Sequence, residues 1–338
     1  LGQLGTASDA VIDALVLLLK DDDLFVRSSA AASLGQLGTA SDAVIDALVS
    51  LLKDDDLFMR YRAAASLGQL GTVSDAVIDV LVLLFKNNVS SYVRSSAAAS
   101  LVQLGTVSNA VTDALVSLLN DDDLFVRSSA AESLGQLGNS SDVVVDALVS
   151  LLKDDGSSVR SRAAESLGQL GNSSGVVVDA LVSLLKDDDS SVRSRAAESL
   201  GQLGNSSDAV IDALVLLLKD DDLSVRSRAA ESLVRFATIS DAVIHVVTNS
   251  LLNLLKDYSL SLKDYYLSRN LLPKNLNLLH GRHDRASKSL ITLSKKSDTV
   301  KPALIEWIEQ NQDEDYAGNG IDVLWELSGG QSTASALA

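Results

Sequence analysis

The stretch NSSDAVIDALVLLLKDDDLSVRSRAAESLVRFA at residues 205–237 recurs with small changes from the start of the chain. Aligned on Leu-Gly-Gln-Leu-Gly, its first glycine falls at Gly2, Gly35, Gly68, Gly135, Gly168 and Gly201, with valine in the same slot at Val102 and Val234. The spacing is 33 residues, apart from one interval of 34. A fixed period of this length is typical of a solenoid of stacked repeats. Residues 1–237 therefore divide into a partial repeat and seven full ones.

The first half of each repeat predicts a helix, shown here by residues 42–53. Its polar residues recur every three or four positions, at Asp42, Asp46, Ser50 and Lys53. This spacing places them on one stripe of a helix that is otherwise apolar. Ser41 or Asp42 is expected to cap its start, because an oxygen-bearing side chain there accepts a free backbone N–H.

The second half predicts a second helix over residues 59–70, after a hinge at Asp54–Asp56 that offers another cap. It should end at Gly71, since glycine takes the left-handed conformation that other residues avoid. Within this helix Gly68 costs about 1 kcal/mol of helix propensity. Close approach of a neighbouring helix is the expected compensation. The fold class is therefore all-α, a solenoid of antiparallel helix pairs.

The period alone does not select a repeat family. The pattern Asp-x-x-Val-Arg-x-x-Ala-Ala-x-x-Leu-Gly-x-Leu-Gly matches at residues 23–38 and 189–204. It resembles the short HEAT repeats of the phycobilisome-lyase type. The Thr-Pro-Leu-His of ankyrin repeats and the Trp, Tyr and Pro pattern of tetratricopeptide repeats are missing from residues 1–237.

Composition limits the function classes. The chain has no Cys and a net charge of −17, of which residues 1–236 hold 18 basic against 33 acidic side chains. Such an acidic array repels phosphate backbones, so nucleic-acid binding is disfavoured and a basic protein partner is easier to bind. The alternative is a solvated acidic surface that only keeps the array soluble. No apolar stretch is long enough for a membrane span. We expect a cytoplasmic protein.

Differences among the near-identical repeats mark two candidate partner-binding surfaces. The first is an Arg/Glu stripe on the second helices, which in arrays of the resembling family line the concave face. Its members are Arg62, Arg162, Arg195, Arg228, Glu132, Glu165, Glu198 and Glu231. Arg and Glu three residues apart are neighbours on a helix surface. The alternative interpretation is that these are exposed positions under little constraint.

The second candidate surface is an aromatic row just before the Val-Arg or Met-Arg pair of the second helix. It consists of Phe25, Phe58, Tyr92 and Phe125, whereas later repeats have serine in this position. Serial aromatic side chains along one edge are typical of an apolar contact surface. The alternative is that each ring covers the end of its own helix pair.

One arginine recurs in every full repeat, and we interpret it as structural. The set is Arg27, Arg60, Arg94, Arg127, Arg160, Arg193 and Arg226. In most repeats an Asp lies four residues earlier, which predicts ion pairs at the hinge and ladders between repeats.

Residues 238–338 depart from the pattern and are predicted to be divergent helical repeats that cap the array. Helices are expected at 241–256, 285–293, 300–310 and 316–327, with a bend or loop over 258–279. Trp307 and Trp325 are expected in the local core. Residues 1–5 read as the end of a second helix, so we expect an N-terminal domain that this sequence does not include.

The sequence contains few residues that could form a catalytic or metal-binding site. The three histidines are His245, His280 and His283, and no further ligand accompanies them at zinc spacing. The Asp triplets lack the ligand spacing and Glu of a calcium loop, so helix capping explains them better. We predict no cofactor, no metal and no catalytic residue.

Three functional hypotheses remain open. The first is a non-enzymatic protein–protein interaction array, the ligand-sensing or scaffolding part of a larger protein. Uniform arrays of this kind resemble those that follow NACHT-type nucleotide-switch ATPases in bacteria. The second is a bilin lyase or a lyase subunit, which the repeat type also resembles. The third is a passive structural spacer.

Overall fold

A computed structural model gives the fold of the chain, and all of its regular structure in the described residues is helical. The described residues are 8–71, 75–86, 90–104, 108–236, 239–268, 285–314 and 316–328. They form two compact parts, an N-terminal segment over residues 1–170 and a C-terminal segment over residues 171–338.

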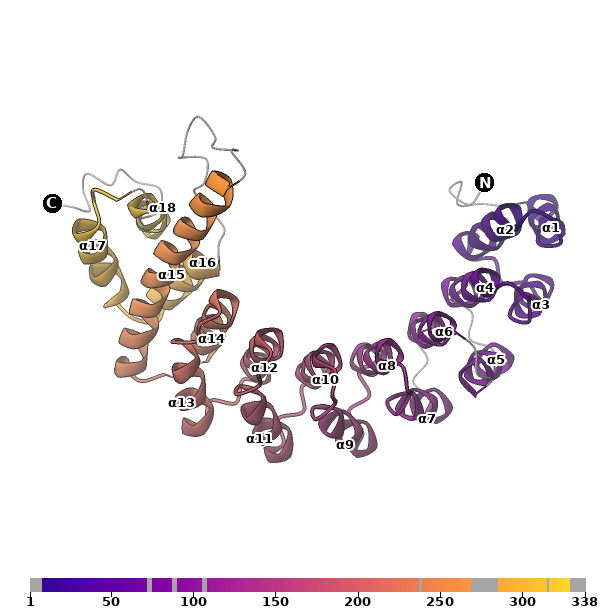
Figure 1. Cartoon of the computed structure of the whole chain (residues 1–338), viewed down its shortest axis with the longest axis horizontal. Coiled ribbons are helices and arrows are strands. Elements are labelled where there is room, and N and C mark those ends of the chain that lie inside the picture. The colour runs from indigo at the N-terminus through magenta and orange to yellow at the C-terminus, as the bar shows by residue number, and fades with distance from the viewer. Residues whose placement is uncertain are drawn as a thin grey trace. The chain divides into compact units, whose positions relative to one another are not determined.

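The helices follow the predicted pairs, two to a repeat (Figure 1). The N-terminal segment contains α1 (Asp9–Leu18), α2 (Leu24–Leu37), α3 (Asp42–Leu51), α4 (Leu57–Gln69), α5 (Asp75–Lys86), α6 (Ser91–Gln103), α7 (Asn109–Leu118), α8 (Leu124–Leu137), α9 (Asp142–Leu151) and α10 (Ser157–Leu170). The C-terminal segment contains α11 (Gly175–Leu184), α12 (Ser190–Leu203), α13 (Asp208–Leu217), α14 (Leu223–Arg235), α15 (Asp241–Ser268), α16 (Arg285–Ser294), α17 (Val300–Gln310) and α18 (Ala317–Leu327). The predicted α-solenoid is confirmed.

The predicted caps set the helix boundaries. The hydroxyl of Ser41 accepts the N–H of Val44 at the start of α3. The carboxylate of Asp56 accepts the N–H groups of Phe58 and Met59 at the start of α4. Among the described residues, the glycines that end these helices have φ between 65° and 69°, at Gly38, Gly71, Gly138, Gly171 and Gly204. Because this conformation is strained for any residue with a Cβ, glycine ends the second helix.

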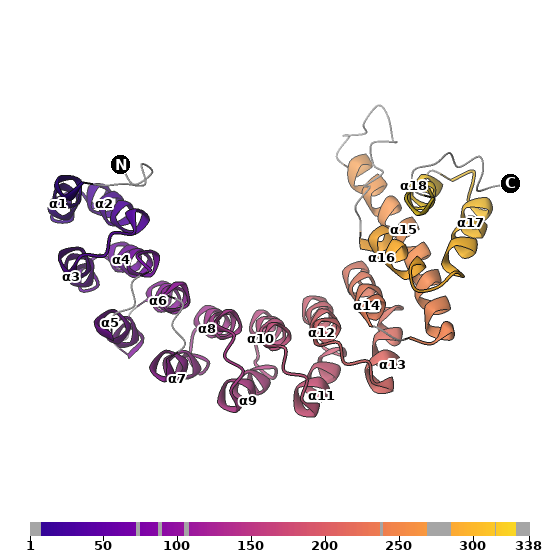
Figure 2. The ribbon, with the colours of Figure 1, turned by 180° about the vertical axis from the view of Figure 1, so that it is seen from behind.

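Within the N-terminal segment the first helices form one row and the second helices another, and Figure 2 shows the same two rows from behind. The second helices pack closely because small residues face one another. A Cβ on Gly135 would lie 2.7 Å from Oγ and 2.8 Å from Cβ of Ser166 in the next repeat. The hydroxyl of Ser166 in turn donates to the carbonyl of Ala131 at 2.7 Å. The predicted close approach at the mid-helix glycine is confirmed.

The core lies between the two rows and consists of repeated aliphatic positions. Leu48 of α3 and Met59, Ala63 and Leu67 of α4 are all at most 1% exposed. The first helix of a repeat contributes large side chains to the core. The small alanines of the second helix allow neighbouring helices to pack close to it. Each buried leucine contributes on the order of 2 kcal/mol by leaving water.

The recurring arginine joins successive repeats, as predicted. Arg127 donates from Nε and Nη2 to the carboxylate of Asp154 at 2.7 and 2.9 Å. Its Nη1 donates to the carbonyls of Asp121 and Asp122 in its own hinge. The Asp four residues earlier, Asp123, has another role, because it accepts the N–H of Phe125 and caps α8. The corresponding arginines also pair with an aspartate further along the chain, at 2.7 Å for Arg94, Arg193 and Arg226 and at 3.8 Å for Arg27.

The C-terminal segment corrects two predictions. A bend or loop was predicted over residues 258–279. This prediction is wrong for residues 258–268, because α15 continues without interruption to Ser268. This stretch lacks the Asp hinge that starts a second helix elsewhere; residues 269–279 lie outside the described residues. Trp325 was expected in the core but is 44% exposed. Trp307 is half-buried and packs against Tyr316 with ring centroids 5.9 Å apart.

A lysine replaces the glycine cap at the end of α14. Phe236 there has φ −62° and ψ 137°, so the chain leaves the helix in an extended conformation. The Nζ of Lys296 donates to the carbonyls of Val234 and Phe236 at 2.6 and 2.5 Å. Helix-terminal carbonyls need such donors when the chain supplies none. This contact has no local sequence signal, because the lysine lies 62 residues from Val234.

Candidate interaction surfaces

The aspartate hinge positions the aromatic row. The carboxylate of Asp23 accepts the N–H of Phe25 at 2.7 Å and that of Val26 at 3.3 Å, which fixes the first turn of α2. The residue after the ring is buried at Val93 and Val126, with at most 1% exposure, and is half-buried at Val26. Consecutive residues of a helix point in different directions. The position before the core residue therefore faces water in every repeat.

The rings of the row are exposed, although to different degrees. Phe25 and Tyr92 are 77% exposed and Phe125 is 71% exposed, whereas Phe58 is 42% exposed. The alternative interpretation was that each ring covers the end of its own helix pair. The high exposure of Phe25, Tyr92 and Phe125 does not fit this alternative. Serine takes this position in the following repeats, as at Ser158. The fold therefore does not need an aromatic side chain there.

Phe58 differs because its own helix covers it. The guanidinium carbon of Arg62 lies 5.2 Å from the centroid of the Phe58 ring. Tyr61 stacks beside the same ring, with centroids 6.4 Å apart and the planes 25° apart. A cation over an aromatic face is attracted by the ring quadrupole.

Acidic groups lie next to the row. Asp22, Asp55 and Asp122 are the middle residues of three hinges and are exposed to solvent. Asp123, which caps α8, has a lowered pKa: burial raises it, but the N–H of Phe125, the hydroxyl of Ser91 and other contacts outweigh that effect. The surface around Phe25, Phe58 and Phe125 is thus both apolar and negatively charged.

The Arg/Glu stripe has a different electrostatic character, because its members pair with one another. In the N-terminal segment, Nη1 of Arg162 lies 2.6 Å from Glu165, and its Nε lies 3.6 Å from Glu132 of the preceding repeat. The predicted pairing three residues apart is confirmed here.

The C-terminal segment repeats this pairing. Arg195 lies 2.8 Å from Glu198, and Arg228 lies 3.0 Å from both Glu198 and Glu231. Burial lowers the pKa of Arg228, against the opposing effect of Glu198. Any partner that used these charges would have to compete with existing ion pairs.

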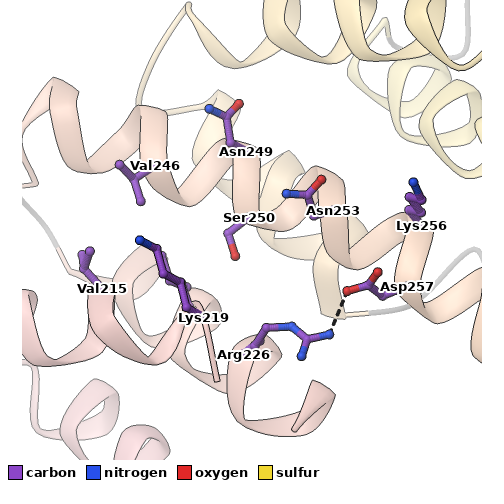
Figure 3. A pocket seen from close by; sticks show the side chains of 10 residues that line it. Val215, Lys219, Arg226, Val246, Asn249, Ser250, Asn253, Lys256 and Asp257 are labelled. Carbon is purple, nitrogen blue, oxygen red and sulfur yellow. Dashed lines mark hydrogen bonds and ion pairs between the residues drawn. The ribbon is translucent and has the colours of Figure 1, made fainter. Parts of the chain in front are cut away.

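Grooves between successive first helices are a third kind of surface, which the sequence analysis did not identify. One of about 620 Å³ lies between α7 and α9 and is lined by carboxylates such as Asp121, Asp122 and Asp155. Its counterpart between α13 and α15, about 520 Å³, is shown in Figure 3. The residues that form these grooves are far apart in sequence, so only packing brings them together.

The second groove is lined by one aspartate, Asp257, and by the amides Asn249 and Asn253. Asn249 and Asn253 of α15 and Lys219 line this groove, and Arg226 donates to Asp257 at 2.7 Å (Figure 3). Lys256 lies over the ring of Tyr316, with Nζ 5.4 Å from its centroid. This groove continues the arginine ladder into the divergent repeats.

The other residues considered for chemistry do not form a site in the part of the chain that is described. His245 is exposed on α15, with its Nε2 3.1 Å from Nδ2 of Asn249. His280 and His283 lie outside the described residues. Within the described ranges, no group of three or more His, Asp or Glu side chains is arranged to hold a metal ion. No helix among these residues is both long and apolar enough to cross a bilayer.

Known proteins share this architecture. The HEAT-repeat family matches residues 12–102, 102–168 and 145–234, and the chain belongs to that family. A search of curated protein sequences gave no match.

Several solved structures resemble the chain. Kap95, the yeast importin-beta, in its Nup1 complex aligns over 97% of this chain and 48% of its own length, with 15% identity and a TM-score of 0.64. YibA of E. coli covers 87% of this chain and 95% of its own, with 22% identity and a TM-score of 0.54. These two likenesses show the fold.

A third likeness is to the CpcE–CpcF complex of phycocyanin lyase from Nostoc sp. PCC7120. It covers 73% of this chain and 94% of that one, with 26% identity and a TM-score of 0.41.

Proposed function

We propose that this chain is a non-enzymatic protein–protein interaction array that binds its partner at the aromatic row. The observation that carries the proposal is the exposure of Phe25, Tyr92 and Phe125 at one position of the repeat. Aromatic side chains dominate binding energy at interfaces because they bury a large apolar area at low entropic cost. A row of them on successive repeats offers a partner several equivalent anchors.

The proposal favours the row over the Arg/Glu stripe on energetic grounds. Contacts to Arg162 or Arg228 would replace ion pairs that already exist at 2.6–3.0 Å. Such exchange gains little net free energy, because each new ion pair takes the place of an existing one, and at the more exposed Arg162 an ion pair contributes only about 0–1 kcal/mol. Covering an exposed ring removes apolar area from water at about 25 cal/mol per Å² and breaks no contact.

The finer parts of the proposal rest on resemblance. We place the array as the sensing or scaffolding part of a larger cytoplasmic protein, joined to an N-terminal domain of the NACHT type. HEAT repeats in general serve as protein-interaction scaffolds, which is consistent with this role.

The test is a pull-down with the whole chain as bait, compared with two triple variants. The first replaces Phe25, Tyr92 and Phe125 by serine, the residue that later repeats carry. The second replaces Arg162, Arg195 and Arg228 by glutamate. Both are checked by circular dichroism and thermal unfolding. The serine variant should stay within about 0.5 kcal/mol of the parent stability, because the rings are exposed.

We expect one protein to be retained by the parent and by the glutamate variant but lost from the serine variant. If the serine variant retains the partner protein and the glutamate variant loses it, the partner binds at the Arg/Glu stripe and not at the aromatic row. Equal retention by both variants would contradict both surfaces.

The two alternatives predict different results. A bilin lyase or lyase subunit would form a coloured complex with added bilin, detected in the visible spectrum. A passive spacer would tolerate removal of whole repeats, and the activity of the protein that contains it would change only in proportion to the length of the array. Neither alternative accounts for the exposed rings.

A further inference from the structure

The row contains one ring whose contact indicates what the others accept. Phe58 is 42% exposed, against 71–77% for Phe25, Tyr92 and Phe125. The guanidinium of Arg62 covers it at 5.2 Å. The Nε of Arg62 is buried and has no hydrogen-bond partner among the described residues. The contact with the ring is thus a cation–π contact that no hydrogen bond from Nε supports.

The other repeats have the same backbone arrangement without the arginine. Arg62 is four residues after Phe58, one helical turn away on the same face. Ser29, Ser96 and Ser129 hold the equivalent positions after Phe25, Tyr92 and Phe125. Arginine occurs at this position in other repeats, as at Arg162. Among the four rings of the row, only Phe58 therefore has an arginine one turn later in its own helix.

The charge around Phe25 and Phe125 favours a cation as well, whereas residues 87–91 before Tyr92 carry no charge. Asp22 and Asp122 are exposed and lie three residues before Phe25 and Phe125. A carboxylate next to a ring adds Coulombic attraction to the attraction of the ring quadrupole. The chain as a whole, with a net charge of −17, also attracts basic partners.

We propose that the aromatic row binds a basic polypeptide, whose arginine side chains lie over Phe25, Tyr92 and Phe125 as Arg62 lies over Phe58. The inference rests on the proposed function and adds the chemistry of the partner. The rings supply the contact face, and at Phe25 and Phe125 the hinge carboxylates select cations over neutral side chains. Acidic segments are excluded by the same charges.

The probe is fluorescein-labelled deca-arginine, with binding to the whole chain followed by fluorescence anisotropy at physiological ionic strength. The serine triple variant at Phe25, Tyr92 and Phe125 leaves the net charge unchanged. We expect it to weaken binding about tenfold or more, because three cation–π contacts are lost. Equal affinity in parent and variant would overturn the inference, since charge alone would then explain the binding.

A second experiment covers two of the rings with an arginine of their own helix, and it compares this double variant with a control of equal charge. Ser29→Arg with Ser129→Arg introduces the Arg62 arrangement in two repeats, and Ser50→Arg with Ser117→Arg adds the same charge on exposed positions of α3 and α7. We expect the first pair to weaken deca-arginine binding several-fold more than the second. An equal loss in both pairs would contradict a role for the rings.

The result separates this inference from the proposed function. If the serine variant loses the partner found by pull-down but binds deca-arginine as the parent does, the row is a docking surface for another chemistry. This inference then fails, and the proposed function stands. If the variant retains both the partner and the peptide, both proposals fail.

Discussion

Arg193 binds Asp220 of the next repeat through two parallel hydrogen bonds, Nε to Oδ2 at 2.7 Å and Nη2 to Oδ1 at 2.8 Å. The hydrogen bond that Arg193 donates to Asp220 raises the pKa of Arg193 and lowers the pKa of Asp220. Both groups are less than a fifth exposed, so water screens their attraction only in part. One side chain thus joins the hinges of two successive repeats.

Replacing Arg193 by Met should lower the free energy of unfolding by about 1–3 kcal/mol, measured by urea denaturation. The variant loses the paired carboxylate and two hydrogen bonds to the carbonyls of Asp187 and Asp188. The control is Arg235→Met, which removes a more exposed pair with Glu231 and should cost at most about 1 kcal/mol. Equal losses in the two variants would contradict a structural ladder.

Acid should weaken the hinge at Asp222. The hydroxyl of Ser224 above all, with that of Ser190 and backbone N–H groups, lowers its pKa from 3.8 to about 2, although burial opposes the shift. A group whose pKa is lowered by folding stabilises the protein above its unfolded pKa. That contribution is lost as the pH falls from about 4 to about 2.

The measurement is the difference in free energy of unfolding between the parent and Asp222→Asn over that pH range. Asparagine can still cap the helix but carries no charge. We expect a constant difference above pH 5, which shrinks toward the acid end. A difference that does not change with pH would show that the carboxylate charge has no part in it.

Gly135 and Ser166 should be energetically coupled. Gly135→Ala alone gains about 1 kcal/mol of helix propensity, but overpacking against Ser166 costs about 1–3 kcal/mol. We therefore expect net destabilisation. Since the contacts of the added Cβ are with the Ser166 side chain and that of Gln169, Ser166→Gly in the same chain should recover part of the loss. A double-mutant cycle with no coupling energy would contradict this close contact.

Lys296→Met should destabilise the docking of α16 on α14 by on the order of 1 kcal/mol, because two carbonyls lose their donor. Hydrogen exchange should become faster in α14 and α16 and remain unchanged in α12. Lys295→Met, a neighbouring exposed lysine, is the control. Equal exchange in all variants would show that the contacts to Val234 and Phe236 do not hold the helix end.

Prediction from the sequence succeeded where a local rule repeats. The polar stripe of the first helix, the Asp56 cap and the Gly71 terminus each depend on residues within a few positions of one another. It failed where the repeat is lost. Without an Asp hinge, no local signal near residue 258 showed that α15 continues, and the exposure of Trp325 depends on distant helices.

The sequence by itself determined the solenoid of HEAT repeats, because a 33-residue period with two amphipathic helices leaves few other ways to bury the apolar faces. It also marked the residues of both candidate surfaces. Tertiary structure alone decided their character. Arg162 and Glu132 come from different repeats, and only packing brings them within 3.6 Å. Likewise, only the tertiary structure shows that the ring of Phe58 is partly covered while those of Phe25, Tyr92 and Phe125 are exposed. The exposed fraction of a side chain depends on all of its neighbours in space.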